Sequence, residues 1–173
     1  MSAAKEEEQA LQQVISERSL ELISTKDLHQ FSEAALRKLS EIFRRAPVAG
    51  LYENRLLMLA LARGGALHYE NGETGLKDID IWAFFSEGPP KPFPPRARWI
   101  ADFGPSKFGR HPDDISSTGR RMDIIGRSIT TQPGEQPEKS VRRWLNGWSR
   151  SAAALRQKPM FAIFPKGISG LRI

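Results

Sequence analysis

Residues 77–85, Lys-Asp-Ile-Asp-Ile-Trp-Ala-Phe-Phe, restrict the possible folds of this chain more than any other segment. Isoleucine and aromatic residues favour an extended strand, and successive side chains of a strand point to opposite faces. One face then carries Asp78 and Asp80 followed by two aromatic residues, and the other face carries only apolar residues. Apolar side chains on both faces predict an inner strand of a sheet that is covered on both sides.

Helical and extended patterns alternate in the rest of the chain. Ser24 followed by Asp27 predicts a capping box at the start of a helix whose apolar residues recur every three or four positions, and Pro47 with Gly50 ends it. The other expected elements are a polar helix over 4–23, a strand over 55–62 that enters a tight turn at Gly64 and Gly65, a turn at Asn71-Gly72, a proline-rich loop over 89–95, a strand over 121–129, a helix from Pro137 to about residue 157, and a short strand or packing tail over 160–164.

These elements predict an α/β (α+β) fold in which helices flank a mixed β-sheet. Residues 1–50 form an N-terminal helical pair that packs on the core, and residues 51–173 form the sheet-containing domain. A length of 173 residues and a hydrophobic content of 39% are enough for one such domain with its own core.

Several classes of protein are excluded by composition. The chain has no cysteine, so disulfides, thiolate metal sites and cysteine nucleophiles are absent. No run of about 18 apolar residues exists, so we expect no membrane span. Glu6, Glu7 and Glu8 stand where a signal peptide would carry positive charge, which favours a cytoplasmic location.

The net charge of +6 is unevenly distributed. Residues 96–173 hold 15 Lys and Arg against 6 Asp and Glu, whereas residues 1–95 hold 11 against 14. A basic surface attracts phosphate-bearing partners through steering and counterion release, although a solvated surface explains it equally well.

Carboxylates on the inner strand are the strongest chemical signal. Asp78 and Asp80 lie two residues apart on one face, roughly 6–7 Å apart at the backbone, so both can reach one divalent cation. Asp123 lies inside the strand expected over 121–129 and is a third candidate ligand. The alternative is that these residues sit in a turn, at a solvated edge, or in pairs with arginines such as Arg121 or Arg127.

The Gly64-Gly65 pair follows an apolar run and precedes Asp78 by a spacer of 12 residues. Glycines let a backbone approach a phosphate closely, although a plain tight turn would also use them. Ala62-Arg63-Gly64-Gly65 together with Asp78-Ile79-Asp80-Ile81 resembles the motif of the nucleotidyltransferase superfamily, which includes polymerase-beta-like enzymes and minimal nucleotidyltransferases. The resemblance covers roughly residues 55–130, with Gly65 in place of the more common serine.

The resemblance implies transfer of a nucleoside monophosphate from a nucleoside triphosphate to a hydroxyl acceptor, which could be a small molecule, a protein or RNA. It implies Mg²⁺ or Mn²⁺ as cofactor. Its implied site residues are the catalytic and metal-binding Asp78, Asp80 and Asp123, and the phosphate-binding Gly64 and Gly65. Arg121 and Arg127 lie near the carboxylates in sequence and are further candidates for phosphate binding.

Two alternatives remain open at this point: a non-catalytic nucleotide-binding or regulatory member of the same fold, and a basic nucleic-acid-binding protein. Three other residues attract attention. His68 is expected to be a satisfied structural residue rather than a nucleotide contact. Trp144 and Trp148, four residues apart on a helix, are expected to pack in the core or at an interface.

Overall fold

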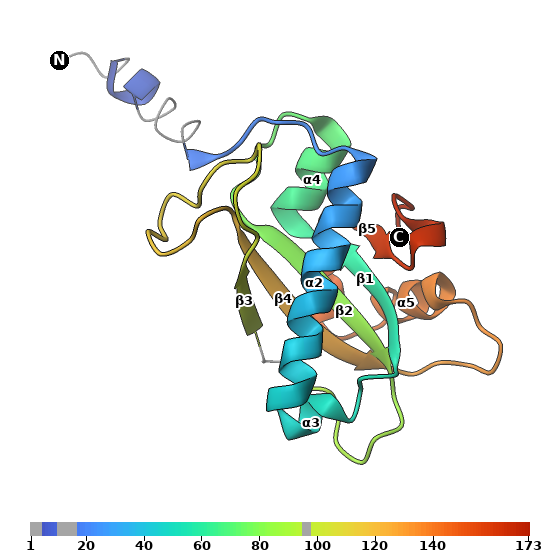
Figure 1. The fold of residues 1–173 in the computed structure, drawn as a ribbon. Coiled ribbons are helices and arrows are strands. Elements are labelled where there is room, and N and C mark those ends of the chain that lie inside the picture. The colour runs from blue at the N-terminus through green and yellow to red at the C-terminus, as the bar shows by residue number, and fades with distance from the viewer. Residues whose placement is uncertain (1–4, 10–16, 95–97) are drawn as a thin grey trace.

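The computed structural model describes residues 5–9, 17–94 and 98–173 and contains a five-stranded sheet. Helices lie on both sides of the sheet (Figure 1). The strand order is β3-β4-β2-β1-β5. The elements in chain order are α2 (Thr25–Arg45), α3 (Pro47–Gly50), β1 (Leu56–Leu61), α4 (Arg63–Asn71), β2 (Ile79–Ser86), β3 (Arg98–Asp102), β4 (Arg121–Ile129), α5 (Pro137–Leu145), α6 (Arg150–Leu155), β5 (Phe161–Phe164) and the 3-10 turn η1 (Lys166–Ile168).

The sheet is mixed, as the sequence predicts. β2 pairs in parallel with β4 and antiparallel with β1, while β3 and β5 pair antiparallel at the two sides. The expected class of a mixed sheet flanked by helices is confirmed. No helix among residues 5–9, 17–94 and 98–173 is long and apolar enough to cross a membrane.

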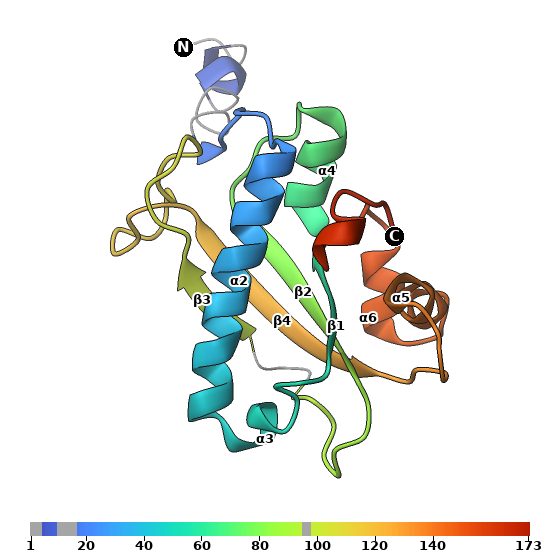
Figure 2. The same cartoon turned by 45° about the vertical axis from the view of Figure 1, so that its right-hand side comes forward.

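Each face of the sheet has its own apolar core. Helix α2 lies across one face (Figure 2), where Phe31 and Leu39 pack with Ile81 and Phe85 of β2. On the other face, helices α5 and α6 pack against the remaining aromatic residues of β2, Trp82 and Phe84. The alternation predicted for the inner strand is therefore confirmed, and it turns Asp80 toward the α5 and α6 side.

Three expectations for the helices and turns are wrong. Residues 18–24 are not helical, because Ser19 pairs with Leu76 in an isolated bridge; residues 10–16 of the same expected helix lie outside the described part. Gly64 and Gly65 belong to the first turn of α4, and Gly72, with a φ of 68°, ends that helix as a left-handed cap. The expected helix from Pro137 to residue 157 is split into α5 and α6.

The long loop between β3 and β4 is fixed by Asp102 at its base. Its carboxylate accepts hydrogen bonds from the backbone N–H groups of Gly104, Thr118 and Gly119 and from the Thr118 hydroxyl, at 2.7–3.0 Å. Burial alone would raise the pKa of Asp102, but these donors outweigh it and hold the pKa below its usual value. The loop is thereby tied to the start of β4.

The capping box of α2 is confirmed and also contacts this loop. The carboxylate of Asp27 accepts hydrogen bonds from the backbone N–H and hydroxyl of Ser24, both at 2.6 Å, and Lys107 of the loop lies 2.7 Å away. Burial acts to raise the pKa of Asp27, but Lys107 and Ser24 stabilise the charged form and lower the pKa overall.

We expect Asp27→Asn to lower the free energy of unfolding at pH 7 by about 1–2 kcal/mol. Because the folded-state pKa is lowered, the contribution of Asp27 is complete above the ordinary carboxyl pKa and is lost as pH falls through the folded-state value. Urea unfolding of the wild type and the variant from pH 7 to pH 3 should therefore converge at low pH. The exposed Glu33→Gln on the same helix is the control, and an unchanging gap between wild type and Asp27→Asn would contradict this assignment.

Candidate functional site

The three predicted carboxylates converge because of strand register. Asp80 of β2 lies directly opposite Asp123 of β4 in the parallel ladder. Neighbouring strands are about 4.8 Å apart and laterally paired side chains share a face, so these two residues are neighbours on the α5 and α6 face. Asp78 lies two residues before Asp80, so its side chain points to the same face. The side chain of Asp123 is 1% exposed and that of Asp78 is 22% exposed, so the group opens toward solvent at Asp78.

Arg121 joins two of these carboxylates. Its Nη2 lies 3.2 Å from Oδ1 of Asp78 and its Nε lies 3.4 Å from Oδ1 of Asp123. The sequence placed Arg121 among the phosphate-binding candidates, and the alternative there was that arginines pair with the aspartates. In the structure, Arg121 pairs with the aspartates.

His111 is a site residue that the sequence interpretation missed. Its ring is buried, and Nε2 lies 2.8 Å from Oδ1 of Asp78. The backbone N–H of Asp113 donates to Nδ1, so Nε2 carries the hydrogen that is donated to Asp78. His111 comes from the loop that Asp102 anchors, 33 residues from Asp78. No local pattern marks it, because its position depends on the folded loop.

Helix α4 begins beside the carboxylates. The backbone N–H of Ala62 donates to the carbonyl oxygen of Asp80 at 2.9 Å, and the helix starts at the next residue. Ala62 supplies no side-chain cap, so the first N–H groups, including those of Gly64 and Gly65, have no acceptor within the helix. A small cleft of about 240 Å³ brings these glycines together with Asp78 and Asp80.

The same cleft is lined by cations. Besides the glycines and aspartates, its lining residues are Arg18, Arg63, Thr74, Lys77 and Lys158. A helix N-terminus with exposed N–H groups and nearby cations favours anionic oxygens, and phosphate groups in particular. The Gly64-Gly65 pair and two of the predicted carboxylates therefore line the same cleft, although the glycines lie in a helix and not in the expected turn.

Arg127, the other predicted phosphate contact, lies apart from the carboxylates. It is four residues beyond Asp123 on β4, which corresponds to about 13 Å along a strand. Its guanidinium carbon lies 5.2 Å from the centre of the Trp144 ring. Arg127 therefore packs on an aromatic side chain instead of facing the group formed by Asp78, Asp80 and Asp123.

The three aspartates are of the right chemical type to bind a divalent cation, but their side chains are not positioned to hold one together. Carboxylate oxygens without Cys or His are the ligands that Mg²⁺ prefers. As the side chains lie, however, no group of three or more acidic, His or Cys residues in the described part of the chain could hold a metal ion. The Arg121 guanidinium lies between Asp78 and Asp123. These two carboxylates could share a cation only if that guanidinium moved.

Arg63 has a strained backbone at this site. Its φ of 54° lies in the left-handed region, which costs a non-glycine residue on the order of 1 kcal/mol or more. The conformation directs the chain from β1 into α4 and leaves the Arg63 side chain exposed beside the cleft. Strain of this kind concentrates at binding and catalytic sites.

We expect Arg63→Gly to raise the free energy of unfolding by about 1 kcal/mol, because glycine adopts a positive φ without a Cβ clash. Arg63→Ala is the matched control, since it removes the same guanidinium but keeps the Cβ. Urea denaturation of both variants measures the difference. Equal stabilities of Arg63→Gly and Arg63→Ala would show that the backbone is not strained there.

Two expectations about other residues can be settled from contacts. His68 is a structural residue, as expected: it is buried, Nε2 lies 3.0 Å from the Glu21 carbonyl oxygen, and Nδ1 accepts from the N–H of Gly75. Trp144 packs on Trp82 and Phe84, as expected for a core residue. Trp148 is fully exposed, so of the two expected places, core or interface, it does not lie in the core; the interface stays a prediction.

A comparison of the chain with protein-family models, with curated proteins and with solved structures finds no match to any of them.

Proposed function

We propose that this chain is a metal-dependent nucleotidyltransferase that transfers a nucleoside monophosphate from a nucleoside triphosphate to a hydroxyl acceptor. The observation that carries the proposal is the register of β2 and β4, which sets Asp80 opposite Asp123. Asp80 of this pair lies beside the uncapped N-terminus of α4. Together with Asp78 it lines one cleft with Gly64 and Gly65, so carboxylates for cations and N–H groups for phosphate oxygens face the same space.

The reaction needs groups that position a triphosphate and groups that accept a proton. The backbone N–H groups of Gly64 and Gly65 would hold the β- and γ-phosphate oxygens, and Arg63 and Lys158 would neutralise their charge. The acceptor oxygen bonds to the α-phosphorus, the bond from that phosphorus to the bridging oxygen of the β-phosphate breaks, and pyrophosphate leaves. Asp123 would take the proton of the attacking hydroxyl.

Asp78, Asp80 and Asp123 would hold two divalent cations. When bound, such cations neutralise the triphosphate and the developing charge on the leaving pyrophosphate. For this, Arg121 must release Asp78 and Asp123. A guanidinium that leaves two carboxylates would be well placed to meet a phosphate, because Arg121 stays on the same strand face as both.

Calorimetry with nucleoside triphosphates tests the proposal. We expect binding in the presence of Mg²⁺ or Mn²⁺ and at least a tenfold loss of affinity in the chelator EDTA, which corresponds to about 1.4 kcal/mol. Equal affinity in EDTA would contradict metal dependence. It would favour a nucleotide-binding module in which Arg121 stays paired with Asp78 and Asp123.

Arg121→Gln tests the competition between the guanidinium and the cation. We expect the variant to bind Mn²⁺ alone several-fold more tightly than the wild type, because the Arg121 guanidinium no longer has to leave Asp78 and Asp123 first. Mn²⁺ binding can be followed by electron paramagnetic resonance. Lys38→Gln, which removes a cation that pairs with Glu41 on α2 and lines neither cleft, is the control. Unchanged or weaker Mn²⁺ binding by Arg121→Gln would mean that the ion pairs are purely structural.

A further inference from the structure

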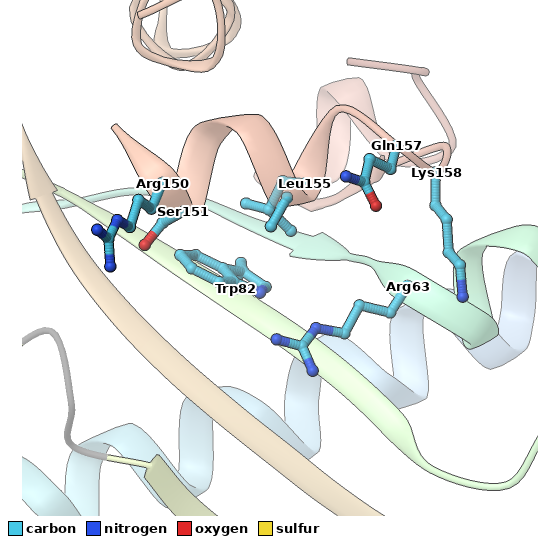
Figure 3. Close-up of a pocket in the computed structure, with 8 residues that line it drawn as sticks. Arg63, Trp82, Arg150, Ser151, Leu155, Gln157 and Lys158 are labelled. Carbon is cyan, nitrogen blue, oxygen red and sulfur yellow. The ribbon is translucent and has the colours of Figure 1, made fainter. Parts of the chain in front are cut away.

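A second and larger cleft adjoins the carboxylate site. It has a volume of about 460 Å³, within the range of small-molecule sites, and it shares Arg63 and Lys158 with the smaller cleft. Figure 3 shows the side chains around it: Arg150 and Ser151 lie at one end, Arg63 and Lys158 at the other, and the Trp82 indole lies between them with Leu155 above. The full lining is Arg63, Trp82, Arg150, Ser151, Ala154, Leu155, Gln157 and Lys158.

The charge of this lining is entirely positive. It contains three cations and neither Asp nor Glu. Within the described residues, none of Arg63, Arg150 and Lys158 forms an ion pair with a carboxylate. Like charges around one space repel unless an anion lies among them, so the cleft suits a ligand that carries negative charge.

The indole N–H of Trp82 lacks a hydrogen-bond acceptor in the described part of the chain. The side chain is 5% exposed, and its Nε1 is buried. A buried donor without an acceptor costs about 1–3 kcal/mol. In Figure 3 the nitrogen lies at the end of the indole that faces Arg63, along the floor of the cleft. A ligand oxygen above that point would satisfy it.

Apolar contacts occupy the middle of the cleft. The flat face of Trp82 and the side chain of Leu155, which are both nearly buried, lie between the two cationic ends. Ala154 continues the same apolar lining. The cleft therefore offers an apolar surface in its centre and cations at its ends.

We propose that this cleft binds the acceptor substrate and that the acceptor is a small organic phosphate monoester with an apolar body and a free hydroxyl. Arg150 and Ser151 would hold the phosphate, Trp82 and Leu155 would contact the apolar body, and the hydroxyl would extend past Arg63 toward Asp78 and Asp80. This assignment of the acceptor rests on the proposed function. A neutral base or sugar would leave the charge of Arg150 without a partner.

Phenyl phosphate is the probe for the ligand chemistry, with phenol, benzoate and inorganic phosphate as separate arms. We expect phenyl phosphate to shift the Trp82 Nε1–H resonance in a ¹H–¹⁵N spectrum and to bind at least tenfold more tightly than phenol or inorganic phosphate. Equal binding of phenol would overturn the anionic assignment, and tighter binding of benzoate would assign the cleft to carboxylates. No shift of the Trp82 resonance with any probe would overturn the site itself.

Substitution of Arg150 tests whether its charge contributes to binding of phenyl phosphate. Arg150→Gln should weaken phenyl phosphate binding about tenfold, as loss of a charge-assisted hydrogen bond predicts. Arg44→Gln, an exposed arginine at the end of α2, is the matched control and should have no effect. An equal effect of both variants would show that phenyl phosphate is attracted by general surface charge. It would contradict a specific binding site at Arg150.

The same probe separates this proposal from the proposed function. Phenyl phosphate should bind equally well in EDTA and to Asp78→Asn/Asp80→Asn, because neither carboxylate lines the larger cleft. Failure of metal-dependent triphosphate binding with retained phenyl phosphate binding would refute the transferase and leave an anion site. Mutually exclusive binding of phenyl phosphate and the metal-bound triphosphate would assign the cleft to the nucleotide and overturn the acceptor assignment.

Discussion

Asp80→Asn and Asp123→Asn are each expected to weaken binding of a Mn²⁺-bound nucleoside triphosphate on the order of 100-fold or more. Each substitution removes one negative charge from the pair that strand register holds together, and even groups that only support metal ligands change affinity by 10- to 100-fold. Calorimetry with Mn²⁺ and each of the four common triphosphates measures the effect. Far-ultraviolet circular dichroism checks that the variants remain folded.

Asp113→Asn is the matched control for these two variants. Asp113 is an exposed aspartate near the same site, and its carboxylate pairs with Lys77 at 2.8 Å. Lys77 stabilises the charged form of Asp113 and lowers its pKa, so this carboxylate is ionised at neutral pH. A loss of affinity in Asp113→Asn equal to that in Asp80→Asn would show that general negative charge, not the β2–β4 pair, attracts the cation.

Gly126→Ala in β4 is expected to destabilise the fold strongly. A Cβ at this position of β4 would lie 1.9 Å from Cε1 of Phe93. Phe93 is 1% exposed and stacks on Phe85 with ring centres 4.4 Å apart, so it cannot move aside without disturbing the core. We expect a loss of about 3 kcal/mol, at the upper end for overpacking, and a fall in melting temperature of roughly 10 °C.

Gly167→Ala is the control for this prediction. Its Cβ would meet nothing within 4 Å, and its φ is not positive, so a change below about 0.5 kcal/mol is expected. Gly126→Ala combined with Phe93→Leu should recover part of the loss, because the smaller side chain leaves space for the new methyl group. A melting temperature for Gly126→Ala within 2–3 °C of that for Gly167→Ala would contradict the close packing of β4 against Phe93.

Local patterns in the sequence were sufficient for the elements that carry the site. The alternation after Lys77 identified the inner strand and put Asp78 and Asp80 on one face, and residues 121–129 form β4 as expected. The capping box of Ser24 and Asp27 is also local, because its donors and acceptors lie within three residues. Such features depend on nearby residues alone and can be recognised before the fold is known.

Other features depend on contacts between distant residues. The Gly64-Gly65 pair indicated a turn because glycine is a poor helix former, but in the first turn of α4 its N–H groups need no partner within the helix. The alignment of Asp80 with Asp123 is set by the pairing of two strands separated by more than thirty residues. The contact of His111 with Asp78 requires the loop that Asp102 anchors.

The role of Arg121 could not be decided from the sequence. Its position two residues before Asp123 is compatible with a phosphate contact and with an ion pair. The folded chain adds that one guanidinium reaches Asp78 and Asp123 together. A cation at this site must therefore compete with a positive side chain, which is a property that spacing alone could not predict.

Pyrophosphate release is the most direct measurement of nucleotidyl transfer. The assay combines the full chain, Mn²⁺, each nucleoside triphosphate and three acceptor pools: hydroxyl-bearing phosphate monoesters, protein and RNA. We predict acceptor-dependent release by the wild type, greatest with the phosphate monoesters, and release reduced to background by Asp78→Asn/Asp80→Asn. Equal release by wild type and variant, or none by the wild type with any triphosphate and acceptor pool, would contradict the assignment of this site to nucleotidyl transfer.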